Sequence, residues 1–325
     1  MKVCIMEKQS NVLVIGKGLI GNKIYEQLLE HGYLNVTVTT HSDLELLSQA
    51  EVNAYFEKHR PEYVFFCAVK SITDFESGQV GDADELYMNV LMQCNIIEAA
   101  RVYGVKKMIL LGSAMLYPWN LGQEEPMEET CLEKFNLPGY RPPMHAAVIG
   151  KFVAMKLCQY YNKQYGIEFI YCLPSHIYGG FAGRKNLYLL ERLVMDICDA
   201  KSEGKHDLFL DIFGEGISQK QFLHVDDCAS AIICIMERYH PDELCTINVG
   251  SFETCCWKSI VENIQELVHY DGTIRFNSDR KENMANRISS VEKLRVLGWT
   301  PKISIKDGLR QLCSEYQNIK RGNLE

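Results

Sequence analysis

Short apolar runs alternate with longer segments of helical period from residue 12 onward. The runs are rich in branched side chains and lie at 12–15, 35–40, 63–69, 107–113 and 167–173. In the segments between them, apolar residues recur every three or four positions. Repeated strand and helix, with strands apolar on both faces, is typical of a parallel sheet covered by helices on both sides. The pattern therefore predicts an α/β fold with a doubly wound parallel sheet.

This regularity ends near residue 179. Beyond it lie an irregular glycine-rich stretch, a helical pattern and the polar turn "SEGKHD". Two strand-like runs ("LFLDIFG" and "QFLHV"), a helix ("DDCASAIICIMERY") and a further strand ("LCTINVG") follow, and two helices around a turn end the chain. We expect residues 1–179 to form the larger domain, with parts of 214–250 returning to it, and 180–325 to form mainly a smaller α/β lobe.

The first strand leads directly into a glycine turn. "VLVIGKGLIGNKI" places three glycines as G-x-G-x-x-G between that strand and a helix. A tight turn, a close backbone approach and a positive helix terminus together suit the pyrophosphate of a dinucleotide, as in Rossmann-type folds. The alternative is a glycine-rich turn that holds no ligand. The candidate cofactor-binding residues here are Gly16, Lys17, Gly18, Leu19, Ile20 and Gly21.

The end of the second strand bears on the choice between NAD and NADP. An acidic residue there favours NAD, because it binds the ribose, whereas an arginine favours NADP. This chain instead offers Thr39, Thr40 and His41. Asp43 is placed either to cap the next turn or to contact a ribose. Thr39 and His41 remain candidate cofactor-binding residues, and the residues leave the preference open.

Composition narrows the class of protein. With 47% hydrophobic residues, the 325-residue chain can bury a full core, and its formal charge of -8 argues against binding nucleic acid or an anionic membrane. Neither a signal peptide nor a membrane-spanning run is expected, so we place the protein in the cytoplasm. Thirteen cysteines without a C-x-x-C pair predict reduced thiols and no metal site.

Several blocks in fixed order carry a family resemblance: "LLGSAMLYP", "KLCQYYNKQYG", "LPSHIYGG", "FGEG" before "QFLHVDD", "INVGS" and "LGW". Through them, residues 11–318 resemble the extended short-chain dehydrogenase/reductases, also called the NAD-dependent epimerase/dehydratase family, and within it the GDP-L-fucose synthases. The resemblance implies an oxidoreductase acting at C4 of a GDP-linked keto sugar, with NADP, or else NAD, as cofactor. It also makes 180–325 mainly the substrate-binding lobe.

In that family a serine, a tyrosine and a lysine form the reductive site. The tyrosine protonates the carbonyl oxygen, the lysine holds the nicotinamide ribose, and the serine orients the substrate. Tyrosine and lysine are four residues apart on a helix, so both side chains lie on one face. Ser113 and Lys151 match the serine and the lysine. The tyrosine position holds Ala147, which leaves Ser113, Lys151 or a bound water as proton source, with Tyr140 and His145 as nearby candidates.

The acid/base pair that epimerises C3 and C5 in the family is also missing. Met115 occupies the cysteine position, and no histidine lies between Gly179 and His206. Since a thioether cannot exchange protons, epimerisation is not expected. Two alternatives to a C4 reductase remain: a catalytically impaired protein that binds a dinucleotide or a nucleotide sugar for regulation, and a different nucleotide-sugar reaction in an altered pocket.

The resemblance implies further site residues and an assembly. Lys220 stands where the family has an arginine and His176 where it has an asparagine, and the family's first turn is one residue longer. The two long helices predicted at 83–104 and 143–165 lie where relatives pair, which implies a homodimer. The implied additional cofactor-binding residues are Lys151, Pro174 and His176. The implied substrate-binding residues are Ser113, Arg184, Arg192, Lys220, Arg280 and Arg287.

Overall fold

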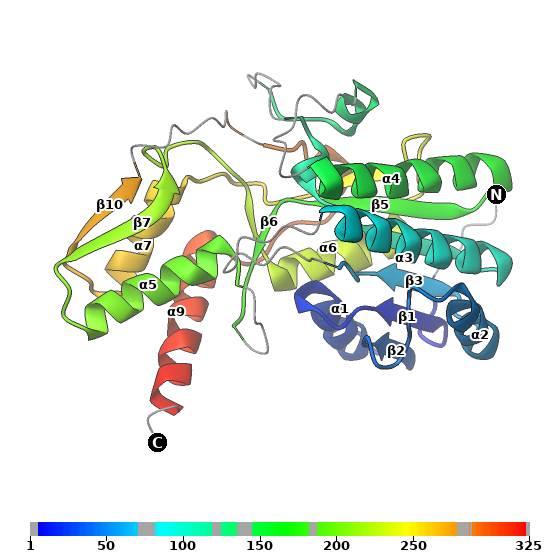
Figure 1. Ribbon diagram of the computed structural model, residues 1–325, viewed down its shortest axis with the longest axis horizontal. Helices are drawn as coiled ribbons and strands as arrows, with labels where there is room; N and C mark the ends of the chain where they lie inside the picture. Colours follow the sequence, from blue (N-terminus) through cyan, green and yellow to red (C-terminus); the bar gives the residue numbers. More distant parts are fainter. Residues whose placement is uncertain are drawn as a thin grey trace.

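Two lobes make up the protein, a larger one around a six-stranded sheet and a smaller one beyond one end of that sheet (Figure 1). The computed structural model describes residues 6–70, 82–118, 125–134, 145–181, 187–277, 286 and 288–322. Within these ranges, none of the helices is both long and apolar enough to cross a membrane.

The large sheet is parallel throughout, in the order β2-β1-β3-β4-β5-β9. Its strands are β1 (Asn11–Ile15), β2 (Asn35–Thr39), β3 (Tyr63–Phe66), β4 (Lys107–Leu111), β5 (Glu168–Pro174) and β9 (Thr246–Val249). The apolar runs form these strands because helices bury both faces of the sheet; all four residues of β3 are buried. The predicted doubly wound parallel sheet is confirmed.

Helices cover the sheet on both faces, each over its own apolar cluster. On one face lie α2 (Gln49–His59), α3 (Asp82–Val102) and α4 (His145–Tyr165), with α3 packed along α4. On the other face α1 (Leu19–Glu30) packs against α6 (Val225–Arg238). The long helices expected at 83–104 and 143–165 are thus present, with ends that differ by no more than two residues.

The smaller lobe has its own core. It contains α5 (Leu189–Ser202), α7 (Trp257–Val268) and α9 (Ile305–Gly322), which pack on one another, and the parallel pair β7 (Asp207–Phe213) and β10 (Thr273–Asn277). Neither α7 nor β10 was predicted. The sequence does contain a signal for α7, because the residues that it buries recur at helical spacing. β10 was not, because none of its residues is fully buried.

Chain segments cross between the lobes at several places. β6 (His176–Tyr178) follows β5 directly and pairs in parallel with β8 (Phe222–His224), from which the chain enters α6. Later, α8 (Glu292–Val296) returns to β9, and Leu294 and Trp299 join the core under α1 and α6. The carboxyl end of the large sheet therefore faces the smaller lobe, as Figure 1 shows.

Candidate active site

The glycine turn lies at the switch point of the large sheet, where β1 is flanked by β2 and β3. Gly16 has a φ of 99°, and a Cβ there would stand 2.8 Å from the backbone nitrogen of Ala68. At Gly21 a Cβ would stand 2.0 Å from the Gly16 carbonyl oxygen. A Cβ on Gly18, by contrast, would have no described heavy atom within 4 Å. Gly16 and Gly21 therefore allow neighbouring backbone segments to approach closely, whereas Gly18 leaves free space in front of the turn.

The start of α1 faces this open side. Gly18 is its N-cap, and among the described residues no side chain caps the helix and no acidic residue lies in its first turn. The first N–H groups of a helix lack partners within it and carry a partial positive charge. This end of α1 can therefore receive an anion such as a pyrophosphate.

A cavity of about 400 Å³ opens beside the turn. It is bounded by the ends of β1, β2 and β3 and by two methionines of α3. The lining residues include Gly16, Lys17, Gly18, Thr39, Thr40, His41, Ala68, Lys70, Met88 and Met92. An apolar slot with a few polar groups suits a purine, and together with the glycine turn it fits a dinucleotide.

Asn89 positions one wall of this cavity and was missed by sequence reasoning. It is buried in α3, where its side chain donates to the Lys70 carbonyl (2.7 Å) and accepts from the Lys70 backbone nitrogen (2.9 Å). The chain after β3 is thereby held against the slot. An asparagine in the middle of a helical pattern was the available signal.

At the end of β2, Asp43 has the capping role that was one of its two expected ones. Its carboxylate accepts from the Thr40 hydroxyl (2.6 Å) and the Thr40 backbone nitrogen (2.7 Å). These hydrogen bonds lower the pKa of Asp43. Asp43 therefore caps its own turn. Thr39 is buried, with its carbonyl accepting from Gly16, and His41 is exposed at the cavity.

Ser113 follows β4 and begins the short 3-10 helix η1 (Ala114–Leu116). Its hydroxyl oxygen accepts from the Met115 backbone nitrogen at 3.1 Å, which caps that helix. The Met115 side chain packs, partly buried, against the core. Helix α4 packs against η1, so the turn after Ser113 lies beside the helix that carries Ala147 and Lys151.

Lys151 is half-buried in α4. Burial lowers the pKa of its ammonium group, and Glu85 on the facing helix α3 acts in the opposite direction. Among the described residues its Nζ has no hydrogen-bond partner. Ala147 lies one turn earlier on the same helix, so the site contains a cationic lysine next to a methyl group.

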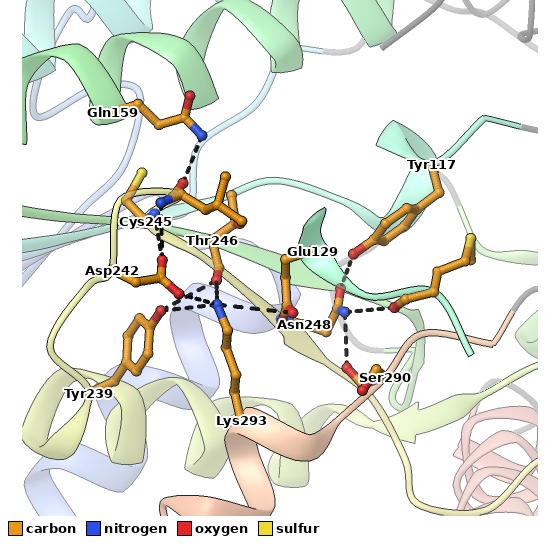
Figure 2. Close-up of polar contacts among 12 residues, drawn as sticks. Tyr117, Glu129, Gln159, Tyr239, Asp242, Cys245, Thr246, Asn248, Ser290 and Lys293 are labelled. Atoms are coloured by element: carbon orange, nitrogen blue, oxygen red, sulfur yellow. Dashed lines mark hydrogen bonds and ion pairs between the residues drawn. The ribbon is translucent and has the colours of Figure 1, made fainter. Parts of the chain in front are cut away.

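A hydrogen-bond network missed by sequence reasoning joins the chain after Ser113 to residues 288–290, the return segment that leads into α8 (Figure 2). The buried Tyr117 hydroxyl donates to the Asn248 side-chain oxygen at 2.8 Å. The Asn248 amide donates to the carbonyls of Met127 (3.2 Å) and Ser290 (2.9 Å). One side chain at the end of β9 thus holds three distant segments together.

Glu129 forms the second half of the network. It belongs to η2 (Glu129–Lys134), and its carboxylate accepts from the Asn248 backbone nitrogen at 2.8 Å. Burial raises the pKa of Glu129, and Lys293, 4.0 Å away, opposes this. Lys293 is itself held by Asp242 (2.7 Å) and the Thr246 carbonyl (2.9 Å). Figure 2 shows these contacts converging on the end of β9.

Gln221 clamps the same return segment from the other side. Its side-chain oxygen accepts from the Ser289 backbone nitrogen (2.9 Å), and its amide donates to the carbonyls of Ser289 (3.0 Å) and Ser251 (2.8 Å). Met127 pairs with the opposite edge of the segment. Residues 288–290 are therefore fixed between the two lobes.

Among the described residues, the remaining predicted site residues do not line the cavity beside the glycine turn. The buried Pro174 ends β5, and the exposed His176 ring lies against Phe222 of the interlobe pair, at a centroid distance of 5.3 Å. Lys220 is buried and donates to the Ser218 hydroxyl. Arg192 is exposed on α5, and its charge partly offsets the burial that raises the pKa of Asp196. The candidates outside the described residues are Arg184, Arg280 and Arg287.

His224 ends β8, and its ring nitrogen accepts a hydrogen bond from the Asp226 backbone nitrogen at 3.3 Å. Within the described ranges, no cluster of three or more histidine, cysteine or acidic side chains is arranged to hold a metal ion.

A doubly wound sheet, a glycine turn at its switch point and an adjoining purine-sized slot define a dinucleotide-binding α/β protein. The chain belongs to the NAD dependent epimerase/dehydratase family, whose model matches residues 12–250. This confirms the family resemblance carried by the sequence blocks.

Individual relatives cover nearly the whole chain. GDP-L-fucose synthase 1 of Arabidopsis thaliana is 31% identical, covering 95% of this chain and 94% of that protein. GDP-L-fucose synthase of Escherichia coli strain K12 is 30% identical, covering 96% and 97%. Among solved structures, the GDP-mannoheptose C4 reductase from Campylobacter jejuni with NADP bound is 28% identical with a TM-score of 0.83, covering 96% and 99%.

Proposed function

We propose that this protein is an NADP-dependent oxidoreductase that reduces the C4 carbonyl of a GDP-linked keto sugar without epimerising C3 or C5. The observation that carries the proposal is the juxtaposition of the turn after Ser113 with the helix bearing Lys151, at the carboxyl end of the sheet that holds the glycine turn. Relatives named as GDP-L-fucose synthases and a GDP-mannoheptose C4 reductase support the substrate class.

Each group has a role in that reaction. When bound, NADPH supplies the hydride that reduces the carbonyl carbon. The open end of α1 binds its pyrophosphate, and the slot near Thr39 and His41 receives its adenosine. Ser113 orients the carbonyl oxygen, and Lys151 offers a cation beside the ribose. Met115 cannot remove a proton from C3 or C5, because a thioether has no exchangeable proton and is a very weak base.

The direct test mixes purified protein with NADPH and GDP-4-keto-6-deoxymannose. We expect oxidation of NADPH, followed by absorbance, and a product reduced at C4. If high enzyme concentrations oxidise no more NADPH than a control without enzyme, the reductase proposal is wrong for this substrate. Running the reaction in D₂O separates the two chemistries: we expect no deuterium at C3 or C5, and deuterium at either carbon would show that epimerisation persists.

A second candidate is a regulatory protein that binds the dinucleotide or the nucleotide sugar without turnover. The observation in its favour is Ala147, which removes the family's proton donor. Binding of NADPH and of the sugar nucleotide, measured by fluorescence and calorimetry, with no NADPH oxidation on prolonged incubation, would support it over the reductase.

We further propose a homodimer that pairs through α3 and α4, and a location in the cytoplasm. The dimer accounts for Tyr87 on α3 and Tyr160 on α4, which are 66% and 61% exposed. The reducing location agrees with the cysteines of the described residues, all of which are free thiols.

A further inference from the structure

We propose that the Lys151 ammonium group donates the proton that completes carbonyl reduction, taking over the task that relatives give to a phenol. The inference rests on the reductase function proposed above and concerns one residue's role within it. Lys151 would then be a catalytic residue as well as a cofactor-binding one.

The helical register carries the first step of this argument. Positions 147, 151 and 155 form one row along α4, since residues four apart share a face. These positions hold alanine, lysine and methionine, so Lys151 carries the one ionisable group of this row. The Ala147 methyl group does not extend over the lysine as a phenol would. This row of α4, the helix that packs against η1, therefore offers an ammonium group and no hydroxyl, whereas relatives offer both.

Tyr140 lies outside the described residues, and the described proton-bearing groups near Lys151 are less suited than its ammonium. Ser113 accepts a hydrogen bond from Met115, and among the described residues no acid or base contacts its hydroxyl to resupply a proton. The buried Tyr117 already donates to Asn248, and burial raises its pKa well above the usual value. His145 lies six residues before Lys151, which points it about 120° away at about 100° per residue.

The surroundings of Lys151 suit an acid. Its ammonium group has no hydrogen-bond partner among the described residues, so its protons are available. Of the charged groups in the described parts of α3, η1 and β5, which pack against α4, Glu85 is the one that acts on it. Burial outweighs that carboxylate and lowers the pKa of Lys151, and a lower pKa makes the ammonium a stronger acid.

The proton and electron balance is complete. As the carbonyl carbon gains the hydride, the carbonyl π electrons move to oxygen, an N–H bond of the ammonium breaks and an O–H bond forms. The products are the alcohol, oxidised cofactor and a neutral amine, which regains its proton from water. With the amine as the conjugate base, reduction is fastest below the pKa of Lys151 and declines as pH rises through it.

Lys151→Arg is the central variant. It keeps a cation beside the ribose, but a guanidinium does not release a proton in the accessible pH range. We expect NADPH affinity within a few-fold of wild type and kcat lower by about 10² to 10⁴. Lys156→Arg is the matched control, because Lys156 lies on the same helix and bonds to Gln159 instead. It should leave kcat unchanged.

A second readout does not depend on turnover. NMR of isotope-labelled lysine, with the Lys151 signal assigned by its loss in Lys151→Arg, follows the titration of this amine with and without NADP⁺. We expect its pKa below the ordinary lysine value in both states. An ordinary or raised pKa would overturn the proposal.

The outcomes separate the two proposals. If wild-type protein reduces the sugar but Lys151→Arg retains its kcat, a water or another group is the donor and this inference fails, while the reductase function stands. If wild-type protein oxidises no NADPH with any GDP-linked 4-keto sugar, the reductase function fails and the donor role fails with it.

Discussion

Ala147 removes a functional group from the site while leaving the helix around it intact. Alanine is a strong helix former, and its neighbour Val148 is fully buried, so the packing of α4 does not depend on a phenol at 147. The loss is therefore chemical rather than structural. Lys151 is half-buried, and no described residue gives its ammonium group a hydroxyl partner, so the ammonium is left to act on a bound substrate.

Restoring the phenol tests this reasoning. In Ala147→Tyr the hydroxyl would share a helix face with Lys151 and add a positioned acid, so we expect kcat for NADPH oxidation to rise by about tenfold or more. The pH dependence should also change, because a phenol replaces the ammonium as donor. Ala146→Tyr, one position around the helix, is the control. Unchanged activity in Ala147→Tyr would mean that the pocket no longer fits the family's geometry.

At the scale of elements, we expect two glycines of the β1–α1 turn to have different roles: Gly21 is needed for folding, and Gly18 for cofactor binding. Gly21→Ala places a Cβ 2.0 Å from the Gly16 carbonyl, so we expect a loss of stability of about 1–3 kcal/mol or more. Gly18→Ala meets no described heavy atom within 4 Å, so it should fold normally but obstruct the space in front of α1. Thermal melts and NADPH titrations should show a lower Tm in the first variant and weaker binding alone in the second. Equal NADPH affinity in Gly18→Ala and wild type would place the cofactor elsewhere.

The contact between η2 and β9 gives a pH prediction. Because burial raises the pKa of Glu129 above its ordinary 4.5, protonation favours the folded state. The stability that the protonated Glu129 side chain contributes is fully present below pH 4.5, and it is lost as pH rises through the raised pKa of the folded state. Glu129→Gln keeps an acceptor for Asn248 but cannot ionise. We therefore expect its Tm, relative to wild type, to increase between pH 4.5 and neutrality.

Two variants control that measurement. Glu128→Gln changes an exposed neighbour and should show no such trend. Glu129→Ala leaves the Asn248 N–H without its acceptor, so it should be about 1–3 kcal/mol less stable than Glu129→Gln at any pH. A constant Tm difference between Glu129→Gln and wild type across this range would contradict a raised Glu129 pKa.

Over the whole molecule, the sequence predicted what depends on local pattern. Apolar runs predicted the large sheet, and strand–turn–helix context placed the glycine turn, because both are set within a few residues. It could not choose between two roles for Asp43, which depend on where one carboxylate points. Nor could it find the network of Tyr117, Glu129 and Asn248, whose partners lie more than a hundred residues apart. The domain bounds at residues 179 and 180 stay a prediction.

The homodimer is the prediction that belongs to the molecule as a whole. Large aromatic side chains left in water on α3 and α4 would each gain about 1.5–3 kcal/mol if a second copy fully buried them. We expect light scattering after size exclusion to give twice the chain mass. The double variant Tyr87→Lys with Tyr160→Lys should give the single mass, because apposed α3/α4 faces would bring four ammonium groups together. Phe209→Lys, which changes a side chain that is 62% exposed on the smaller lobe, should remain dimeric. A monomeric wild type, or a double variant that stays dimeric, would exclude this pairing and leave Tyr87 and Tyr160 as solvent-facing residues.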